Sequence, residues 1–126
     1  REQGIGRKIA LTAEGRAHPM FEGKTSTFDA YMSHEDEVAT VPPNAIVLAS
    51  NSHSYVQAIA VRYKGGDFWA VQYHPEYNLN EVAALAYTRR MKLTGMGFFE
   101  DEQAALEWIG KGRQLAKEPH RKDLRW

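Results

Sequence analysis

The spacing of apolar residues changes once along this chain, just after Glu76, and that change constrains the fold more than any other feature. Before it, β-branched and aromatic residues alternate or cluster between turn residues, which is typical of strands. We predict five strands, at residues 7–12, 26–33, 45–50, 56–63 and 68–73. After it, apolar residues from Val82 to Met91 recur about every 3.6 positions, which predicts a helix. We therefore expect a strand-rich part, residues 1–77, followed by helices and a tail, residues 78–126.

Local signals support the boundaries of several elements. The segment Lys64-Gly65-Gly66-Asp67 separates two predicted strands and favours an antiparallel hairpin. Asn78, followed three residues later by Glu81, resembles a capping box and indicates where the first helix begins. A second helix is predicted over residues 102–117. We expect these two helices to cover one face of the sheet.

Composition narrows the classes of function. The 126 residues, of which 43% are hydrophobic, suit one domain with its own core. The 16 basic and 16 acidic residues balance, so the chain has no net field to attract nucleic acid or an anionic membrane. No apolar run approaches the roughly 20 residues of a membrane span. Cysteine is absent, which agrees with a reducing compartment. We expect a cytoplasmic protein without a nucleic-acid or membrane partner.

The candidate chemistry lies in the segment from Val71 to Glu76, where an apolar strand leads into His74, Pro75 and Glu76. In an extended chain, residues i and i+2 point to the same side, so Glu76 can accept a hydrogen bond from His74. That bond would fix the tautomer and leave the other ring nitrogen as a base. Pro75 also disfavours helical geometry at the histidine. The pair is half of a catalytic triad, and the chain offers no nucleophile: it has no cysteine and no Gly-x-Ser-x-Gly turn.

The segment Gln72-Tyr73-His74-Pro75-Glu76 resembles the histidine-proline-glutamate signature of class I glutamine amidotransferases, a family with a cysteine, histidine and glutamate triad. Other segments agree with the family in order and spacing: Met32-Ser33-His34, Val38, Val41-Pro42, Val47-Leu48-Ala49-Ser50 and Val56-Gln57-Ala58-Ile59. The resemblance covers residues from about 8 to 80 well. It is nearest to the amidotransferase domains of GMP synthases.

The resemblance implies a flavodoxin-like α/β fold, here the C-terminal part of one domain over residues 1–126, with a mixed sheet and two terminal helices. It makes His74 the triad base and Glu76 the residue that orients it. It sets the loop of Ser33, His34 and Glu35 along bound glutamine, although relatives often carry glycine where Glu35 stands. It implies no cofactor and no metal.

The family's cysteine belongs to a sharp Gly-x-Cys-x-Gly turn upstream of the region that Arg1 onward resembles. Because the chain also lacks an initiating methionine, we expect it to be the later part of a longer protein. The complete site would release ammonia from glutamine for a synthetase domain or subunit. Residues 1–126 alone are expected to be inactive.

Three alternatives remain open. In the first, the domain hydrolyses γ-glutamyl compounds, as related hydrolases do, instead of transferring ammonia. It could also be an inactive, glutaminase-like module that regulates or scaffolds a partner. A third reading joins His74, Glu76 and the distant His120 into an iron site with two histidines and one carboxylate. The helices predicted between these residues disfavour that site.

Overall fold

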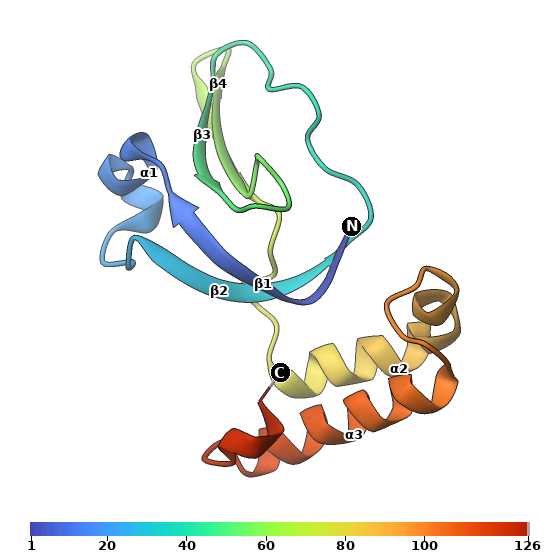
Figure 1. Cartoon of the computed structure of the whole chain (residues 1–126). Coiled ribbons are helices and arrows are strands. Elements are labelled where there is room, and N and C mark those ends of the chain that lie inside the picture. The colour runs from blue at the N-terminus through green and yellow to red at the C-terminus, as the bar shows by residue number, and fades with distance from the viewer. Residues whose placement is uncertain (126) are drawn as a thin grey trace. The chain divides into compact units, whose positions relative to one another are not determined.

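The computed structural model of the protein describes residues 1–125, which form two compact units. Unit 1, Arg1–Pro75, holds the sheet, and unit 2, Glu76–Trp126, holds a pair of helices (Figure 1). This division falls close to the boundary that the change of apolar spacing predicts. That the two units belong to one domain stays a prediction.

The elements follow the predicted order of strands and then helices. Unit 1 contains β1 (Glu2–Leu11), α1 (Ala13–Ala17), the 3-10 turn Pro19–Phe21, β2 (Thr27–His34), β3 (Ala45–Ser50), β4 (Ala58–Tyr63) and β5 (Gly66–Val71). Unit 2 contains α2 (Leu79–Gly95), α3 (Glu102–Lys117) and the 3-10 turn Lys122–Leu124. The α/β class is confirmed. No helix within residues 1–125 combines the length and the apolar character needed to cross a lipid bilayer.

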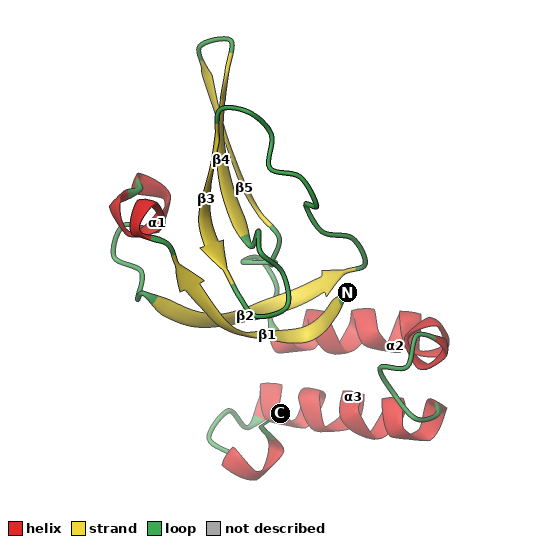
Figure 2. Cartoon of the chain, turned by 45° about the horizontal axis from the view of Figure 1, so that its top comes forward, coloured by secondary structure: helices red, strands yellow, loops and turns green. Residues whose placement is uncertain are grey.

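The five strands form one curled sheet in the order β2-β1-β3-β4-β5 (Figure 2). Every pairing in it is antiparallel, so the mixed sheet that we expected is wrong in this part of the fold. Parallel neighbours need a crossover of a dozen or more residues, usually a helix. Here β3, β4 and β5 follow one another through short connections, which return the chain in the opposite direction.

The strand β1 begins five residues earlier than predicted, at Glu2 rather than at residue 7. Its pairing with β2 shifts register between Gly6 and Ile9, where Lys8 takes a left-handed φ of 52°. The Asp29 carboxylate accepts the Lys8 backbone N–H at 2.8 Å, and this bond is the main reason why the pKa of Asp29 lies below its ordinary value. Gly4, Gly6 and the bulge at Lys8 interrupt the alternation of apolar and polar residues. The first half of this strand therefore could not be predicted from that alternation.

The hairpin between β4 and β5 is confirmed. Tyr63 pairs with Gly66, and the two residues between them have positive φ, 48° at Lys64 and 81° at Gly65. Both central residues of a type I′ turn need this conformation, and glycine adopts it without strain. The turn therefore sets the register of β5, which ends at Val71 instead of continuing to residue 73 as predicted.

The core of unit 1 combines residues of β1, β2, β3 and β4 with one residue of the 3-10 turn and one that follows β5. It consists of Ile9, Leu11, Phe21, Met32, Leu48, Ala49, Ala58 and Tyr73. Thr12 caps α1 by accepting the Gly15 N–H at 2.9 Å, and its hydroxyl donates to the Val47 carbonyl of β3 at 2.9 Å. A Cβ on Gly15 would fall well inside contact distance of the Leu48 carbonyl oxygen. Only glycine at position 15 allows α1 to approach β3 this closely. The sequence did not predict α1, because five residues are too few to show a helical spacing of apolar residues.

Unit 2 is a helical hairpin with well-formed caps. The predicted capping box is confirmed: Asn78 accepts the Glu81 N–H at 3.1 Å, and the Glu81 carboxylate accepts the Asn78 N–H at 2.8 Å. Its core comprises Ala83, Ala86, Leu93 and Ile109, with Phe98, Phe99 and Trp108 packed against them. Tyr87 and Met91 belong to the apolar pattern that predicted this helix, yet they are 43% and 61% exposed. The Tyr87 ring lies instead within reach of two guanidinium groups, those of Arg90 and Arg113.

Candidate functional site

His74 follows β5 and is tied by its backbone to β2. Its N–H donates to the Tyr31 carbonyl at 2.8 Å, and two residues earlier the Gln72 N–H donates to the Gln57 carbonyl at 2.9 Å. Tyr31 stands two residues before Ser33 in the same strand. The structure thus joins the backbone of His74 to β2 at Tyr31, in the strand that ends with Ser33 and His34.

The segment from Gln72 to Glu76 is not a continuation of the strand. The chain bends at Gln72 and Tyr73 and turns at Pro75 and Glu76, because pairing with β4 ends at Val71. We predicted that His74 and Glu76 point to the same side because residues i and i+2 do so in an extended strand. The backbone here is not an extended strand, so that argument does not apply. Glu76 is also the first residue of unit 2. The hydrogen bond between these two side chains, and their triad roles, stay predictions.

Ser33 and His34 end β2, and Glu35 opens the loop of residues 35–44. The Ser33 hydroxyl donates to Gln3 Oε1 at 3.1 Å, and Glu35 is exposed. Further along the loop, Val38 lines a small cleft of about 60 Å³ together with Gln72, and the lining of this cleft includes none of the predicted site residues. Contact of these residues with glutamine stays a prediction.

The His34 ring is fixed on both sides. Its Nδ1 lies 2.8 Å from the Asp36 carbonyl oxygen, and its Nε2 lies 3.0 Å from Glu2 Oε2. The two side chains are only 7% and 10% exposed. Glu2 starts β1 and His34 ends β2, and the antiparallel register pairs them directly. A histidine expected near the substrate therefore has a buried carboxylate as its partner.

Glu2 is the centre of a larger polar cluster. Asn51 Nδ2 donates to its Oε1 at 2.9 Å, and Gln57 Nε2 donates to its Oε2 at 2.7 Å. The Asn51 amide has only one suitable orientation, because its Oδ1 accepts the Ser54 N–H at 2.8 Å. Burial acts to raise the pKa of Glu2, but the hydrogen bonds from Asn51, Gln57 and His34 outweigh it and leave the pKa below its ordinary value of 4.5. Glu2 is therefore ionised at neutral pH.

Sequence reasoning missed Glu2, Asn51 and Gln57 as members of this site. One signal was present: Gln57 is a polar residue inside the apolar run from Val56 to Ile59, and it is fully buried. A buried polar group needs hydrogen-bond partners, so this glutamine marked a polar cluster. Glu2 carried no comparable signal, because its partners lie 32 to 55 positions away.

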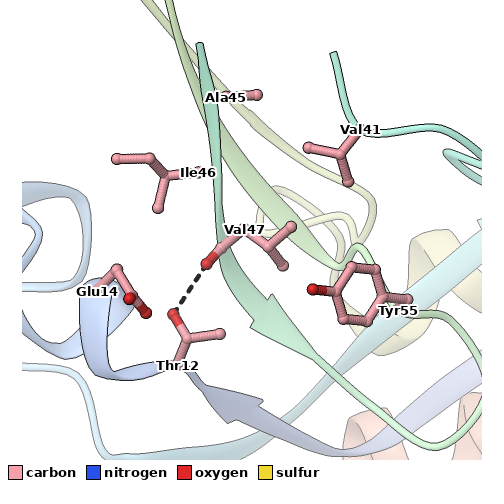
Figure 3. A pocket seen from close by; sticks show the side chains of 7 residues that line it. All are labelled: Thr12, Glu14, Val41, Ala45, Ile46, Val47 and Tyr55. Atoms are coloured by element: carbon pink, nitrogen blue, oxygen red, sulfur yellow. Dashed lines mark hydrogen bonds between the residues drawn. The ribbon is translucent and has the colours of Figure 1, made fainter. Parts of the chain in front are cut away.

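A wider hollow of about 480 Å³ lies along the first half of β3, beside α1 (Figure 3). Its lining comprises Thr12, Glu14, Val41, Ala45, Ile46, Val47 and Tyr55. β1 pairs only with the end of β3, at Ala49 and Ser50, which leaves this half of the strand open on one side. The lining contains none of the predicted site residues. Within residues 1–125, no group of three histidine, aspartate or glutamate side chains is placed to hold a metal ion.

Comparison with known proteins decides the family. Residues 1–90 match the family model described as glutamine amidotransferase class-I. The chain belongs to this family. The Pseudomonas sp. gamma-glutamyl-L-1-hydroxyisopropylamide hydrolase is 34% identical to it over 116 residues, 87% of this chain and 39% of the hydrolase. One subunit of the glutamine-hydrolysing GMP synthase of Ignicoccus hospitalis is 34% identical over 74 residues, 59% of this chain and 38% of that subunit. The glutamine-hydrolysing GMP synthase of Thermosipho africanus is 41% identical over 58 residues, 46% of this chain and 11% of the synthase.

The resemblance found in the segments from Met32 to Glu76 is thus confirmed as a family relationship. This amidotransferase-family chain spans less than two fifths of the length of these relatives. The activity of the whole protein and the roles of its residues are accordingly matters for proposal.

Proposed function

We propose that this chain supplies the histidine base and glutamate of a Cys-His-Glu triad that hydrolyses the side-chain amide of glutamine. The observation that carries the proposal is the bond from the His74 N–H to the Tyr31 carbonyl, in a chain of this family. It joins the backbone of the histidine to β2, the strand that ends with Ser33 and His34, and these two residues and Glu35 are proposed to contact the substrate. Base and substrate loop would then meet on one side of unit 1.

The proposed reaction proceeds through a thioester. A cysteine outside residues 1–126 transfers its proton to His74 and attacks the amide carbon of glutamine. His74 returns that proton to the leaving nitrogen, which departs as ammonia, and water then releases glutamate by the same base. Glu76 accepts the other ring N–H and holds the tautomer, and backbone N–H groups stabilise the oxyanion. Residues 1–126 contain no cysteine, so alone they should be inert.

The ammonia would pass to a synthetase domain or subunit. The name of the Ignicoccus relative, which is one subunit of a GMP synthase, supports an amidotransferase that works beside a separate synthetase chain. We place this reaction in the cytoplasm, in agreement with the absence of cysteine from the chain.

A second candidate is hydrolysis of a γ-glutamyl alkylamide. The similarity to the Pseudomonas hydrolase extends over a larger share of this chain than the similarity to the synthases. The triad chemistry is the same, with an alkylamine leaving in place of ammonia. Specificity would then depend on the space around the leaving group.

The test uses the full-length natural protein that contains this chain. Ammonia release from glutamine is compared with amine release from γ-glutamylisopropylamide. His74→Ala should lower kcat on the preferred substrate by about 10³-fold, since a positioned acid-base group typically contributes 10²–10⁴-fold. Glu76→Gln should cost less, because an imidazole keeps some activity without its orienting partner.

His120→Ala, in the exposed tail, is the matched control and should leave turnover unchanged. Unchanged hydrolysis in the His74 variant would contradict the triad role. A wild-type protein that turns over neither amide would instead favour an inactive regulatory module.

A further inference from the structure

Both ring nitrogens of His34 lie within hydrogen-bond distance of an oxygen atom. Nδ1 faces the Asp36 carbonyl oxygen and Nε2 faces Glu2 Oε2, and both of these oxygens accept hydrogen bonds. A neutral imidazole has only one N–H, so it can satisfy one of these contacts and would turn a lone pair toward the other oxygen. Both contacts are satisfied when the ring is an imidazolium.

The groups around the ring support this charge state. Glu2, from β1, supplies the negative charge, while Asp36 contributes a carbonyl from the loop of His34 itself. Asn51 and Gln57, from the connection between β3 and β4, donate to Glu2 and keep both of its oxygens as acceptors. His53, in the same connection, also acts on Glu2 electrostatically and favours its ionised form.

We propose that Glu2 is a positioning residue for substrate binding: it holds His34 as an imidazolium and thereby keeps residues 33–36, the end of β2 and the start of the following loop, in one conformation. The substrate, a γ-glutamyl amide, rests on the function proposed above. The ring bonds β1 on one side and the loop backbone on the other, so it links the end of the sheet to the loop. A conformation of this segment that separates the ring from Glu2 would leave a buried charge without its partner, which costs free energy. Such conformations are therefore disfavoured.

The expected kinetic effect is on binding. A loop that must be ordered when substrate arrives loses affinity in proportion to the time it spends in other conformations. Glu2→Gln keeps the shape of the side chain but replaces one acceptor oxygen with an NH₂ group. In one orientation of the new amide, its NH₂ group would face the Asn51 donor. In the other orientation, it would face the donors of His34 and Gln57.

In the full-length protein, Glu2→Gln should raise KM about tenfold while kcat changes less than about twofold, the pattern of lost ground-state binding. His34→Gln should raise KM by a similar factor. Because the two residues are in contact, the double variant should be no worse than either single variant by more than about twofold. Glu22→Gln, an exposed carboxylate of unit 1, is the matched control and should leave both constants unchanged.

A second measurement does not depend on activity. In full-length protein labelled with ¹⁵N-histidine, the His34 signals, assigned by their loss in His34→Gln, should show both ring nitrogens protonated at pH 7. In Glu2→Gln they should show a neutral ring, and hydrogen exchange of the backbone of residues 33–36 should become faster.

The outcomes separate the two proposals. A neutral His34 in the wild-type protein, unchanged exchange in Glu2→Gln, or an unchanged KM in an active protein would overturn the positioning role. Lost turnover in His74→Ala together with an unchanged KM in Glu2→Gln would support the triad and reject this inference. A wild-type protein without amidase activity would reject the proposed function, and the role of Glu2 in ordering the loop would then be decided by the ring signals and the exchange rates.

Discussion

Side-chain hydrogen bonds inside unit 1 join residues that are farther apart in the sequence than those inside unit 2. In unit 1, the polar cluster joins Glu2 to His34, Asn51 and Gln57, which lie 32, 49 and 55 positions away. In unit 2, the side-chain bonds span shorter separations, from the caps at Asn78 and Asp101, which close over three residues, to the bond from Arg90 to Glu102, twelve positions away. The proposed chemistry lies mainly in the unit with long-range bonds. Long-range bonds can bring together residues from several strand ends, which a local helical pattern cannot do.

The ion pairs show the same contrast. The pair of Glu2 and His34 is buried, whereas Arg121 and Asp123, 2.6 Å apart, are 37% and 60% exposed. The hydrogen bond from Arg121 still lowers the pKa of Asp123 to about 2. Solvent and salt screen such an exposed pair. We therefore expect the Arg121–Asp123 pair, although shorter, to stabilise the fold less than the buried pair of Glu2 and His34, whose atoms are 3.0 Å apart.

The largest difference between the units is expected from glycine replacement. Gly15→Ala forces a Cβ against the Leu48 carbonyl oxygen, so we expect unit 1 to lose about 3 kcal/mol or more of unfolding free energy. Gly110→Ala in α3 meets open space and should instead stabilise unit 2 by about 0.5–1 kcal/mol, because glycine is a poor helix former. Hydrogen exchange of peptides from each unit of the full-length protein measures both effects. Equal effects of the two replacements would contradict the close contact between α1 and β3.

An intermediate effect is expected from removing the buried charge. At pH 7, Glu2→Gln should lower the unfolding free energy of unit 1 by about 2 kcal/mol, since it leaves buried donors unsatisfied. The pKa of Glu2 is lowered by folding, so its stabilisation is present above pH 4.5 and is lost as the pH falls below that value toward the folded-state pKa. The difference between wild type and variant should therefore shrink below pH 4.5. Denaturant unfolding at several pH values measures it, and a difference independent of pH would contradict an ionised Glu2.

The smallest effect is expected from a local cap. Asn78→Ala removes the acceptor for the first turn of α2 and should cost about 1 kcal/mol, with faster hydrogen exchange confined to unit 2. Asn80→Ala, two residues into the same helix, is the control and should not destabilise it. Faster exchange in β1 or β2 of the Asn78 variant would contradict the prediction that loss of this cap affects unit 2 alone.

Elements with local signals could be predicted well. The strand Ala45–Ser50 and the helix Glu102–Lys117 were predicted with their observed bounds, and the capping box at Asn78 was also predicted. Elements that depend on distant partners were not. The first half of β1 is stabilised by pairing with β2 across a bulge, and α1 depends on Thr12 and Gly15 meeting β3.

The candidate site divides in the same way. His74, Glu76, Ser33, His34 and Glu35 could be named from motifs, because a triad and a family signature need particular residue types in a particular order. The buried carboxylate of Glu2 could not be named. Nothing near it in the chain indicates that it meets His34, and the direction of its pKa shift depends on donors from Asn51 and Gln57.

By itself, the sequence determined the family, the strand and helix content, and the histidine proposed as base, because these follow from residue type and short spacings. The tertiary structure alone decided the antiparallel strand order, the end of β5 at Val71, and the pairing of His34 with Glu2. The physical reason is that strand pairing and buried ion pairs join residues far apart in the chain, and their free energy exists only once the sheet has brought them together.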